Sequence, residues 1–217
     1  MIWIAILLVL LSYFYGCFST ARIVTKSVRS LNIYRVGSGF ADTENIYSNI
    51  SKSLGVIVGA LDVTKSYAYL YFMKFILVTM DKMAVPPDLS GLYSANMLMV
   101  YGVAMLIGHC LPLTHNLRGG RGIFTYMGFI LFVSFYPMLI TMVLALLLVF
   151  IFRQIRFAQY MIVLLPVILT QFMSSLHRYV QILPSQNVVA SFTTKLLGIA
   201  ILMGILNFVV SKRLKEF

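Results

Sequence analysis

The pentapeptide RGGRG, which begins at Arg118, places two arginines and three glycines between apolar segments. Glycines allow positive φ angles and close backbone approach, and successive N–H groups before a helix can converge on an anion. The following helix adds the positive end of its dipole, and Arg118 and Arg121 add full charges. The spacing therefore predicts a phosphate-binding turn, with backbone donors at Gly119, Gly120 and Gly122.

This phosphate hypothesis makes a specific prediction at Gly120. An added methyl group would block backbone approach to a phosphate without removing charge, so Gly120→Ala should raise the Michaelis constant and leave stability near wild type. A flexible loop whose arginines only anchor lipid headgroups explains the spacing equally well, and it predicts unchanged kinetics in the mutant.

A second glycine turn lies earlier in the chain, in the sequence RVGSGFADTEN. Ser38, between Gly37 and Gly39, offers a hydroxyl group beside exposed N–H groups, and Asn45 can support the turn from the segment that follows. Taken alone, this tripeptide is typical of an ordinary turn. Two anion-suited turns in a chain with few polar segments favour a shared anion site.

Charged and polar side chains inside the apolar runs are further candidates. Asp62 and Lys65 are three residues apart, so one helix face carries both and predicts an ion pair, with a direct substrate role for Lys65 as the alternative. His109 either supports the site with a hydrogen bond or packs between helices. Because no His, Cys or carboxylate cluster has metal-ligand spacing, we expect neither a metal nor a cofactor.

The composition sets the class of protein that positions these residues. Hydrophobic residues make up 60% of the 217 residues and charged residues 11%, and the mean hydropathy is +0.93. These values predict an all-α, polytopic membrane protein with one integral membrane domain over residues 1–217. The net charge of +11 suits anionic lipids and anionic substrates. Nucleic acid is not expected as a partner, because no basic soluble domain is present to hold it.

Apolar runs long enough to cross a bilayer lie at 2–24, 54–80, 92–112, 123–152, 157–176 and 190–210. The fourth run would form about 45 Å of helix, against a hydrocarbon core of about 30 Å. It must either kink once near Pro137 or fold as a hairpin.

Lysine and arginine counts favour the hairpin, because short cytoplasmic loops are rich in both residues. It leaves only Lys82 and Arg178 outside, and the largest cytoplasmic loop is then 25–53. The residues placed inside are Arg22, Lys26, Arg29, Arg35, Lys52, Arg118, Arg121, Arg153, Arg156, Lys212, Arg213 and Lys215. The pattern predicts about seven transmembrane helices, with the N-terminus outside and the C-terminus cytoplasmic.

These segments, in this order, resemble the acyl-phosphate glycerol-3-phosphate acyltransferases of bacterial membranes, the PlsY family. The family's first motif, G-S-G-N-P-G-A-T-N, is similar to the turn at Gly37, Ser38, Gly39 and Asn45. Its D-x-x-K-G element resembles the segment from Asp62 to Lys65. Its second motif, G-H-x-x-P, K-G-G-K-G and T-x-x-G, is similar to Gly108, His109, Pro112, Arg118, Gly119, Gly120, Arg121, Gly122, Thr125 and Gly128, with arginine for both lysines.

The resemblance implies a seven-helix fold in the inner cell membrane and a reaction of phospholipid synthesis. An acyl chain would pass from acyl phosphate to glycerol 3-phosphate and give lysophosphatidic acid. The departing phosphate can accept the proton, so orientation and charge stabilisation supply the catalysis and no Ser-His-Asp triad is needed. In this scheme the RGGRG turn holds one phosphate, Ser38 and Asn45 orient the second substrate, and Lys65 and His109 support the site.

Several positions depart from the family pattern. FADTE replaces N-P-G-A-T in the first motif, and Ser48 stands in place of an arginine. The family's R-Y-V-S-L-A-S has no clear counterpart in FRQIRFAQY, and its closing H-R-x-N-I-x-R-L survives only as Arg213 and Leu214. Arg35 or Lys52 could compensate for the lost arginine if residues 45–52 continue as a helix.

These departures keep open an alternative of another class. It is a non-catalytic paralogue of the same fold that binds lipid or a partner protein in the membrane. A small-anion transporter is less favoured, because two matching halves with broken helices are not evident.

Overall fold

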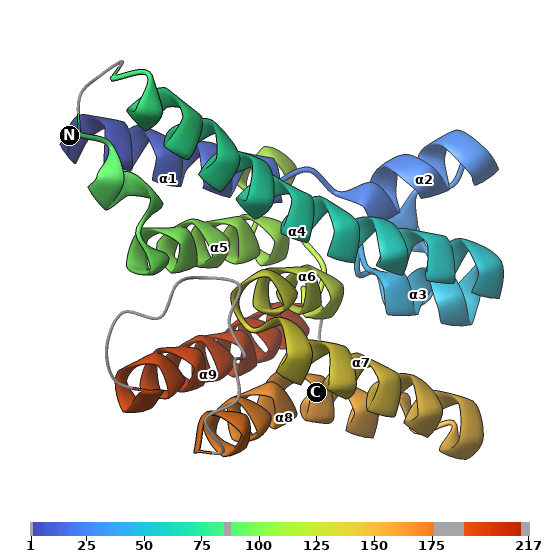
Figure 1. The fold of residues 1–217 in the computed structure, drawn as a ribbon. Helices are drawn as coiled ribbons and strands as arrows, with labels where there is room; N and C mark the ends of the chain where they lie inside the picture. Colours follow the sequence, from blue (N-terminus) through green and yellow to red (C-terminus); the bar gives the residue numbers. More distant parts are fainter. Residues whose placement is uncertain (1, 85–87, 176–188, 214–217) are drawn as a thin grey trace.

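The computed structural model describes residues 2–84, 88–175 and 189–213, and every regular element in these ranges is helical (Figure 1). The α-helices are α1 (Ile2–Gly16), α2 (Thr20–Arg29), α3 (Thr43–Asn49), α4 (Lys52–Lys82), α5 (Ala95–Cys110), α6 (Ile123–Val133), α7 (Phe135–Leu147), α8 (Ile155–Ser175) and α9 (Val189–Arg213). Short 3-10 helices occupy Ile33–Arg35, Ser90–Tyr93 and Leu113–His115, and a π-helical turn occupies Leu148–Phe152. The predicted all-α class is confirmed. Arg178, Leu214 and Lys215 lie outside the described residues.

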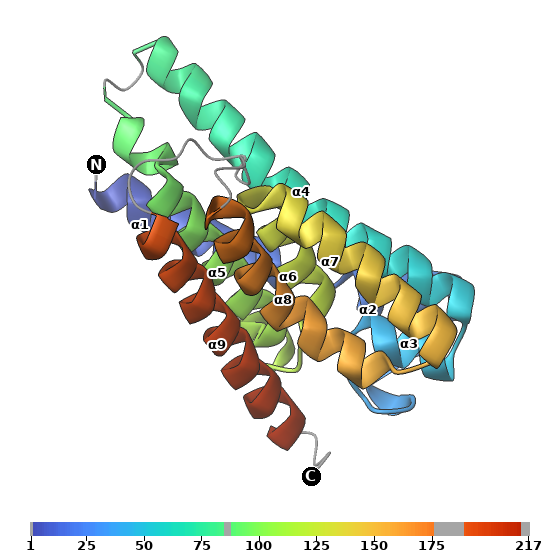
Figure 2. The same ribbon diagram turned by 60° about the horizontal axis from the view of Figure 1, so that its bottom comes forward.

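The helices form one bundle with large apolar side chains on its outer surface. Helix α1 packs against α5 and α4 against α6, while α7, α8 and α9 lie side by side (Figures 1 and 2). A Cβ atom at Gly16 would lie 2.0 Å from the Met105 carbonyl oxygen, and one at Gly108 would lie 2.0 Å from the Tyr13 carbonyl oxygen. Glycine is therefore required on both helices for α1 and α5 to pack this closely.

Within the described residues, five helical segments are long and apolar enough to cross a membrane: Ile2–Arg29, Ala95–His115, Phe135–Phe152, Ile155–Met173 and Ser191–Arg213. The protein is therefore a multi-pass membrane protein. Helix α4 has 31 residues but carries Asp62 and Lys65, and it is not among the five. Helix α6 has 11 residues, about 16 Å of helix, which is short for a core of about 30 Å. The count of seven spans stays a prediction.

The predicted span 2–24 lies within the candidate span Ile2–Arg29, which is not one continuous helix. Helix α1 ends at Gly16, and α2 begins at Thr20 after a cap in which Ser19 accepts a hydrogen bond from the Arg22 N–H at 3.3 Å. The break has a local use, because it frees the carbonyl oxygen of Phe18. The Lys65 ammonium donates to this oxygen at 2.8 Å.

The fourth apolar run breaks at Ser134, where φ is −140° and ψ is 80°. The Tyr126 hydroxyl donates to the Val163 carbonyl at 3.0 Å, and the hydroxyls of Ser134 and Thr170 lie 2.8 Å apart. Helices α6 and α8 therefore run in the same direction. Because a short connection after Phe152 joins α7 to α8, α7 must run against both. The run is a hairpin, as the charge count predicted.

Candidate functional site

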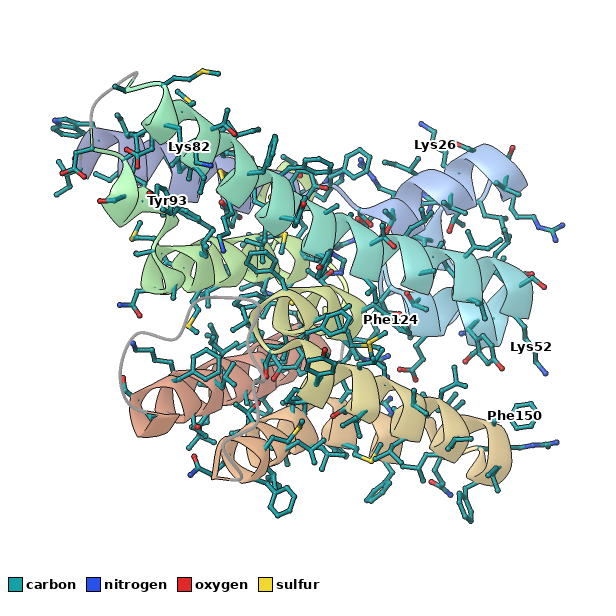
Figure 3. The ribbon with its side chains drawn as sticks, in the orientation of Figure 1. Lys26, Lys52, Lys82, Tyr93, Phe124 and Phe150 are labelled. Atoms are coloured by element: carbon teal, nitrogen blue, oxygen red, sulfur yellow. The ribbon has the colours of Figure 1, made fainter. Side chains whose placement is uncertain are left out.

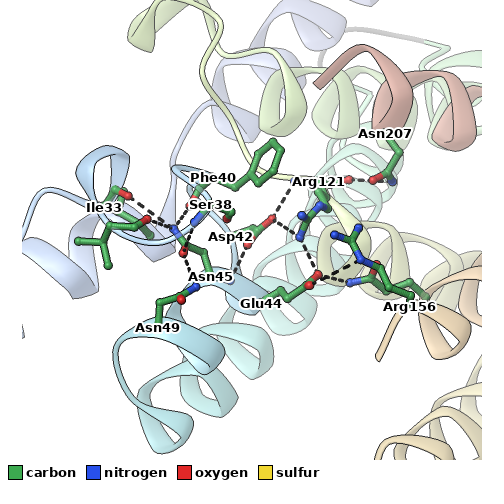
Figure 4. Close-up of polar contacts among 12 residues, drawn as sticks. Ile33, Ser38, Phe40, Asp42, Glu44, Asn45, Asn49, Arg121, Arg156 and Asn207 are labelled. Carbon is green, nitrogen blue, oxygen red and sulfur yellow. Dashed lines mark hydrogen bonds and ion pairs between the residues drawn. The ribbon is translucent and has the colours of Figure 1, made fainter. Parts of the chain in front are cut away.

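Asn45 organises the glycine turn that precedes α3. Its side-chain amide donates to the Val36 carbonyl at 3.0 Å and to the Phe40 carbonyl at 2.9 Å, and its oxygen accepts from the Ser38 N–H at 3.2 Å. Asn45 is only 1% exposed. Its polar atoms are therefore engaged by the chain itself, so in this structure it shapes the turn (Figure 4).

The glycines on either side of Ser38 have the backbone angles that the turn requires. Gly37 has a φ of +55° and Gly39 a φ of +74°, a region that side chains disfavour. Between them, the buried Ser38 hydroxyl oxygen has no hydrogen-bond partner among the described residues. A buried hydroxyl without a partner is costly, which makes Ser38 a candidate for a contact with substrate.

The RGGRG loop packs between this turn and the end of α5. The Gly119 carbonyl accepts from the Ala41 N–H at 3.4 Å, and the Gly120 N–H donates to the His109 carbonyl at 3.4 Å. A Cβ atom at Gly119 would lie 2.2 Å from the His109 carbonyl oxygen, and one at Gly120 would lie 2.7 Å from the Ala41 carbonyl oxygen. These glycines therefore serve close packing against the protein backbone, and the Gly120 N–H already has a partner.

This packing corrects the prediction for Gly120→Ala. The new methyl group would meet backbone atoms, which cannot move aside as the end of a flexible side chain can. The substitution is therefore expected to lower stability. Gly122, with a φ of +77°, lies just before α6, where the fold requires a left-handed residue.

Arg121 lies at the centre of an ion-pair network (Figure 4). Its side chain is 3% exposed, and Nη1 lies 2.6 Å from Glu44 Oε2 and 3.6 Å from Asp42 Oδ2. The guanidinium also lies 4.4 Å from the centre of the Phe40 ring. The Asn207 side chain on α9 donates to the Arg121 carbonyl at 3.3 Å. The loop is thus joined to α3 and to α9.

Glu44 extends the network from α3 to α8. Its carboxylate accepts from Gln159 Nε2 at 2.5 Å, and Arg156 Nε lies 4.0 Å away. The Glu44 side chain is 21% exposed and that of Arg156 is 57% exposed. Glu44 therefore lies at the rim, between a buried arginine and an exposed one.

Asp42 has a mainly structural position. It caps α3 by accepting from the Asn45 N–H at 2.9 Å, and it accepts from the Arg121 N–H at 3.4 Å. Burial raises the pKa of this carboxyl group, and the Arg121 guanidinium opposes that shift.

The two arginines of the loop lie in different environments: Arg121 is buried and Arg118 is exposed. Arg118 is exposed, and its carbonyl oxygen accepts from the Tyr34 hydroxyl at 3.0 Å. Burial raises the pKa of Tyr34, while the charges of Arg22 and Arg118 oppose the shift. Arg213 Nη1 donates to the Leu117 carbonyl at 3.4 Å. Positive side chains thus collect on the solvent side of the loop.

The predicted pair in α4 forms a second polar cluster. Lys65 Nζ lies 2.9 Å from Asp62 Oδ1 and 3.4 Å from His109 Nδ1. The Thr20 hydroxyl donates to Asp62 Oδ1 at 2.5 Å. Lys65 therefore contacts α4, α5 and the break between α1 and α2, and its ammonium is fully engaged.

A small polar cavity separates the two clusters. Its volume is about 20 Å³, enough for one water molecule but not for a phosphate group. The residues that line it are Asp42, Thr43, Glu44, Asp62, His109, Arg121, Gly122, Ile123, Phe124 and Gln159. Residues of the first motif, of the second motif and of the Asp62–Lys65 element therefore line the same cavity.

Arg35 and Lys52, the two candidates to replace the family arginine missing at Ser48, do not lie on a helix that continues through residues 45–52. Helix α3 ends at Asn49 and α4 begins at Lys52, so residues 45–52 are not one helix. Lys52, Arg35 and Ser48 are all exposed. Their backbone positions do not bring them into the network of Arg121.

Sequence reasoning did not identify Gln159 and Asn207 as site residues. Each is a polar amide within a largely apolar helix. Such residues inside membrane segments usually face the protein interior. A polar amide in an apolar helix was therefore the one sign that Gln159 and Asn207 face the protein interior. The sequence does not show which residue each amide contacts, because that depends on how α8 and α9 pack.

Comparison with known proteins identifies the family of the chain. A family model described as glycerol-3-phosphate acyltransferase matches residues 6–213. The glycerol-3-phosphate acyltransferase of Thermoanaerobacter pseudethanolicus is 31% identical over 130 residues, which are 60% of this chain and 58% of the relative. That of Endomicrobium trichonymphae is 30% identical over 139 residues, or 64% and 62%. The match therefore spans less than two thirds of either relative.

The fold is also that of a solved membrane enzyme. The crystal structure of PlsY, an integral membrane glycerol 3-phosphate acyltransferase, in its glycerol 3-phosphate form superposes with a TM-score of 0.66 at 22% identity. The superposition covers 96% of this chain and 88% of that one. The lysophosphatidic acid form gives a TM-score of 0.65. Because the family model covers nearly the whole chain and the fold agrees, the protein belongs to the glycerol-3-phosphate acyltransferase family.

Proposed function

We propose that the protein is a membrane acyltransferase that moves an acyl chain from acyl phosphate to glycerol 3-phosphate and forms lysophosphatidic acid. One observation carries the proposal for this family member. The Ser38 turn and the RGGRG loop are bonded backbone to backbone, through the Ala41 N–H and the Gly119 carbonyl. This contact supports a single site to which both motifs contribute.

The reaction needs little covalent help from the protein. A glycerol hydroxyl oxygen attacks the acyl carbonyl carbon, the bond from that carbon to the phosphate oxygen breaks, and the departing phosphate takes the hydroxyl proton. The protein must hold two phosphate groups and align the reacting atoms, which is orientation and charge stabilisation. Basic and backbone donors around a turn are suited to that task.

The geometry supports distinct roles for the candidate residues. The Ser38 hydroxyl, which has no hydrogen-bond partner among the described residues, would contact a substrate, whereas Asn45 would act by holding the turn. Arg118 offers an exposed charge to a phosphate. Lys65 and His109 would act from the far side of the cavity, Lys65 by fixing Asp62 and the helix break.

Glycerol 3-phosphate is the proposed acceptor because the family is described by it and because one PlsY crystal structure is a glycerol 3-phosphate form. Acyl phosphate is the proposed donor because the phosphate that leaves it can accept the proton of the attacking hydroxyl. Membrane lipids would surround the apolar outer surface. No metal or cofactor enters the proposal.

We also propose that the whole chain is one domain of the inner cell membrane, with seven crossing helices. Figure 3 places Lys26 and Lys52 at one end of the molecule, and Lys82 and Tyr93 at the other. Helix α2, which carries Arg22 and Arg29, lies at the end with Lys26 and Lys52 (Figure 1). The positive-inside rule therefore supports a cytoplasmic position for that end and an outside N-terminus.

The decisive experiment offers the purified protein acyl phosphate and labelled glycerol 3-phosphate. Labelled lysophosphatidic acid is the expected product, and acyl thioester donors should give none. A protein that is stabilised by glycerol 3-phosphate but forms no product would instead be the non-catalytic paralogue. Absence of both binding and product would refute the proposed function.

A further inference from the structure

Arg121 has the position of a phosphate ligand but already has a carboxylate partner. We propose that Glu44 is an internal counter-ion of Arg121, which the phosphate of a substrate must displace, so that Glu44 sets the affinity for phosphorylated substrates. This inference rests on the proposed function for the identity of the substrate. Its geometric basis is independent of the acyl-transfer step.

Of the two carboxylates beside the guanidinium, that of Glu44 is the nearer. The distance from Arg121 Nη1 is 2.6 Å to Glu44 and 3.6 Å to Asp42. The Arg121 side chain is almost fully buried, and the cavity beside it has a volume of only about 20 Å³. A phosphate can therefore reach the guanidinium only if a side chain at the cavity moves.

Glu44 is the side chain best placed to move. It lies at the rim, and Gln159 and the exposed Arg156 already contact it from α8. If Glu44 swings toward Arg156, its charge stays paired and Arg121 gains a phosphate in its place. The exchange leaves neither charge buried without a partner, which would otherwise be strongly unfavourable.

Asp42 is a poorer candidate for this exchange. Its carboxylate caps α3 and also accepts from the Arg121 backbone N–H, so it is fixed by two backbone groups. Asp42 would remain in place when a phosphate enters. It would then limit how tightly the site holds a doubly charged group.

The residues of this network all occupy positions at which the sequence departs from the family motifs. Glu44 and Asp42 replace uncharged positions of the first motif, and Arg121 replaces a lysine of the second. Arg156 and Gln159 come from the segment that lacks a counterpart of R-Y-V-S-L-A-S. Departures in three separate segments therefore contact one another.

The test measures binding of glycerol 3-phosphate and of inorganic phosphate to the purified full-length protein, together with steady-state kinetics. Glu44→Gln keeps the size of the side chain and its contact with Gln159 but removes the charge. We expect the dissociation constants and the Michaelis constant for glycerol 3-phosphate to fall roughly tenfold, with a smaller change in kcat. Asp88→Asn, a matched substitution at an exposed carboxylate just before the 3-10 helix Ser90–Tyr93, should change neither.

A double-mutant cycle separates this role from a structural one. In an Arg121→Gln background, Glu44→Gln should no longer improve binding, because the counter-ion acts only through Arg121. Unchanged or weaker binding in the single mutant would overturn the proposal, as would an improvement that persists without Arg121. Should Glu44→Gln fail to fold, Glu44→Asp must improve binding by a smaller factor, and failure of both to fold would show a structural role.

Binding and turnover report on different claims. If no variant forms lysophosphatidic acid but Glu44→Gln still tightens phosphate binding, the proposed function fails and the counter-ion proposal stands. If the wild type is active and Glu44→Gln binds phosphate as the wild type does, the counter-ion proposal fails alone.

Discussion

The guanidinium of Arg121 lies 2.6 Å from the carboxylate of Glu44, although 77 positions separate the two residues in the chain. The contact joins the RGGRG loop to α3, and Gln159 joins the same carboxylate to α8. Three segments that carry little chemistry alone thereby form one charged network. The network borders the small cavity that lies between it and the Asp62–Lys65 cluster.

Substitution of Gly120 by alanine should destabilise the protein. The new Cβ atom would lie 2.7 Å from the Ala41 carbonyl oxygen, and overpacking of this kind costs about 1 to 3 kcal/mol. Gly198→Ala on α9 is the matched control, because a methyl group added there would meet no atom within 4 Å. Thermal unfolding in detergent should show a lower Tm only for Gly120→Ala. Equal Tm values would mean that the loop is not packed as described.

Lys65→Met should be among the most destabilising single substitutions in α4. It removes the ammonium that lies 2.9 Å from the buried Asp62, and breaking a buried pair on one side costs about 3 to 5 kcal/mol. Adding Asp62→Asn to Lys65→Met should recover part of this loss, since no buried charge then lacks its partner. The comparison uses thermal unfolding of the wild type and both variants. A double mutant less stable than Lys65→Met would contradict this account.

Ser38→Ala should separate catalysis from folding. The Ser38 hydroxyl has no hydrogen-bond partner among the described residues, so stability should stay within about 0.5 kcal/mol of wild type. If this hydroxyl contacts glycerol 3-phosphate, kcat/KM for that substrate should fall about tenfold. The measurements are the Tm and the steady-state kinetics of acyl transfer. Wild-type kinetics would remove Ser38 from the proposed site.

Asn45→Ala should lower stability and not activity alone, in contrast to Ser38→Ala. The amide is 1% exposed and bonds three backbone groups of the turn. Its loss should reduce stability by about 2 kcal/mol or more, because buried backbone groups lose their partners. Activity should fall together with the folded fraction. A stable variant with selectively lost activity would instead place Asn45 in contact with substrate.

Labelling of single cysteines should establish the orientation. Lys26→Cys and Asn116→Cys should react from the cytoplasmic side and Met83→Cys from the outside, in a background that lacks the buried Cys17 and Cys110. Lys26 and Met83 are exposed, and Asn116 lies in the turn after the 3-10 helix Leu113–His115. Reaction of Met83→Cys and Asn116→Cys from one side would exclude the proposed topology.

Much of the fold followed from local sequence. Apolar runs locate the long helices because burial in lipid requires a minimum length of apolar residues. Charge counts also predicted that the run 123–152 folds back, and the break lies at Ser134, three residues before Pro137. The break after Gly16 was not predicted, although Gly16 and the capping residue Ser19 are local signals for it. What stabilises it is Lys65, whose ammonium bonds the Phe18 carbonyl 47 positions away.

For the site, the sequence by itself determined the family, the two glycine turns and the Asp62–Lys65 pair, because each is encoded by neighbouring residues. Only the tertiary structure decided that Arg121 is buried against Glu44 while Arg118 is exposed. The two arginines have the same local pattern, but the Arg121 side chain lies against Glu44 of α3, which Gln159 of α8 also contacts, while the Arg118 side chain is exposed. A charge's partner depends on which helices meet around it, and spacing along the chain does not contain that information.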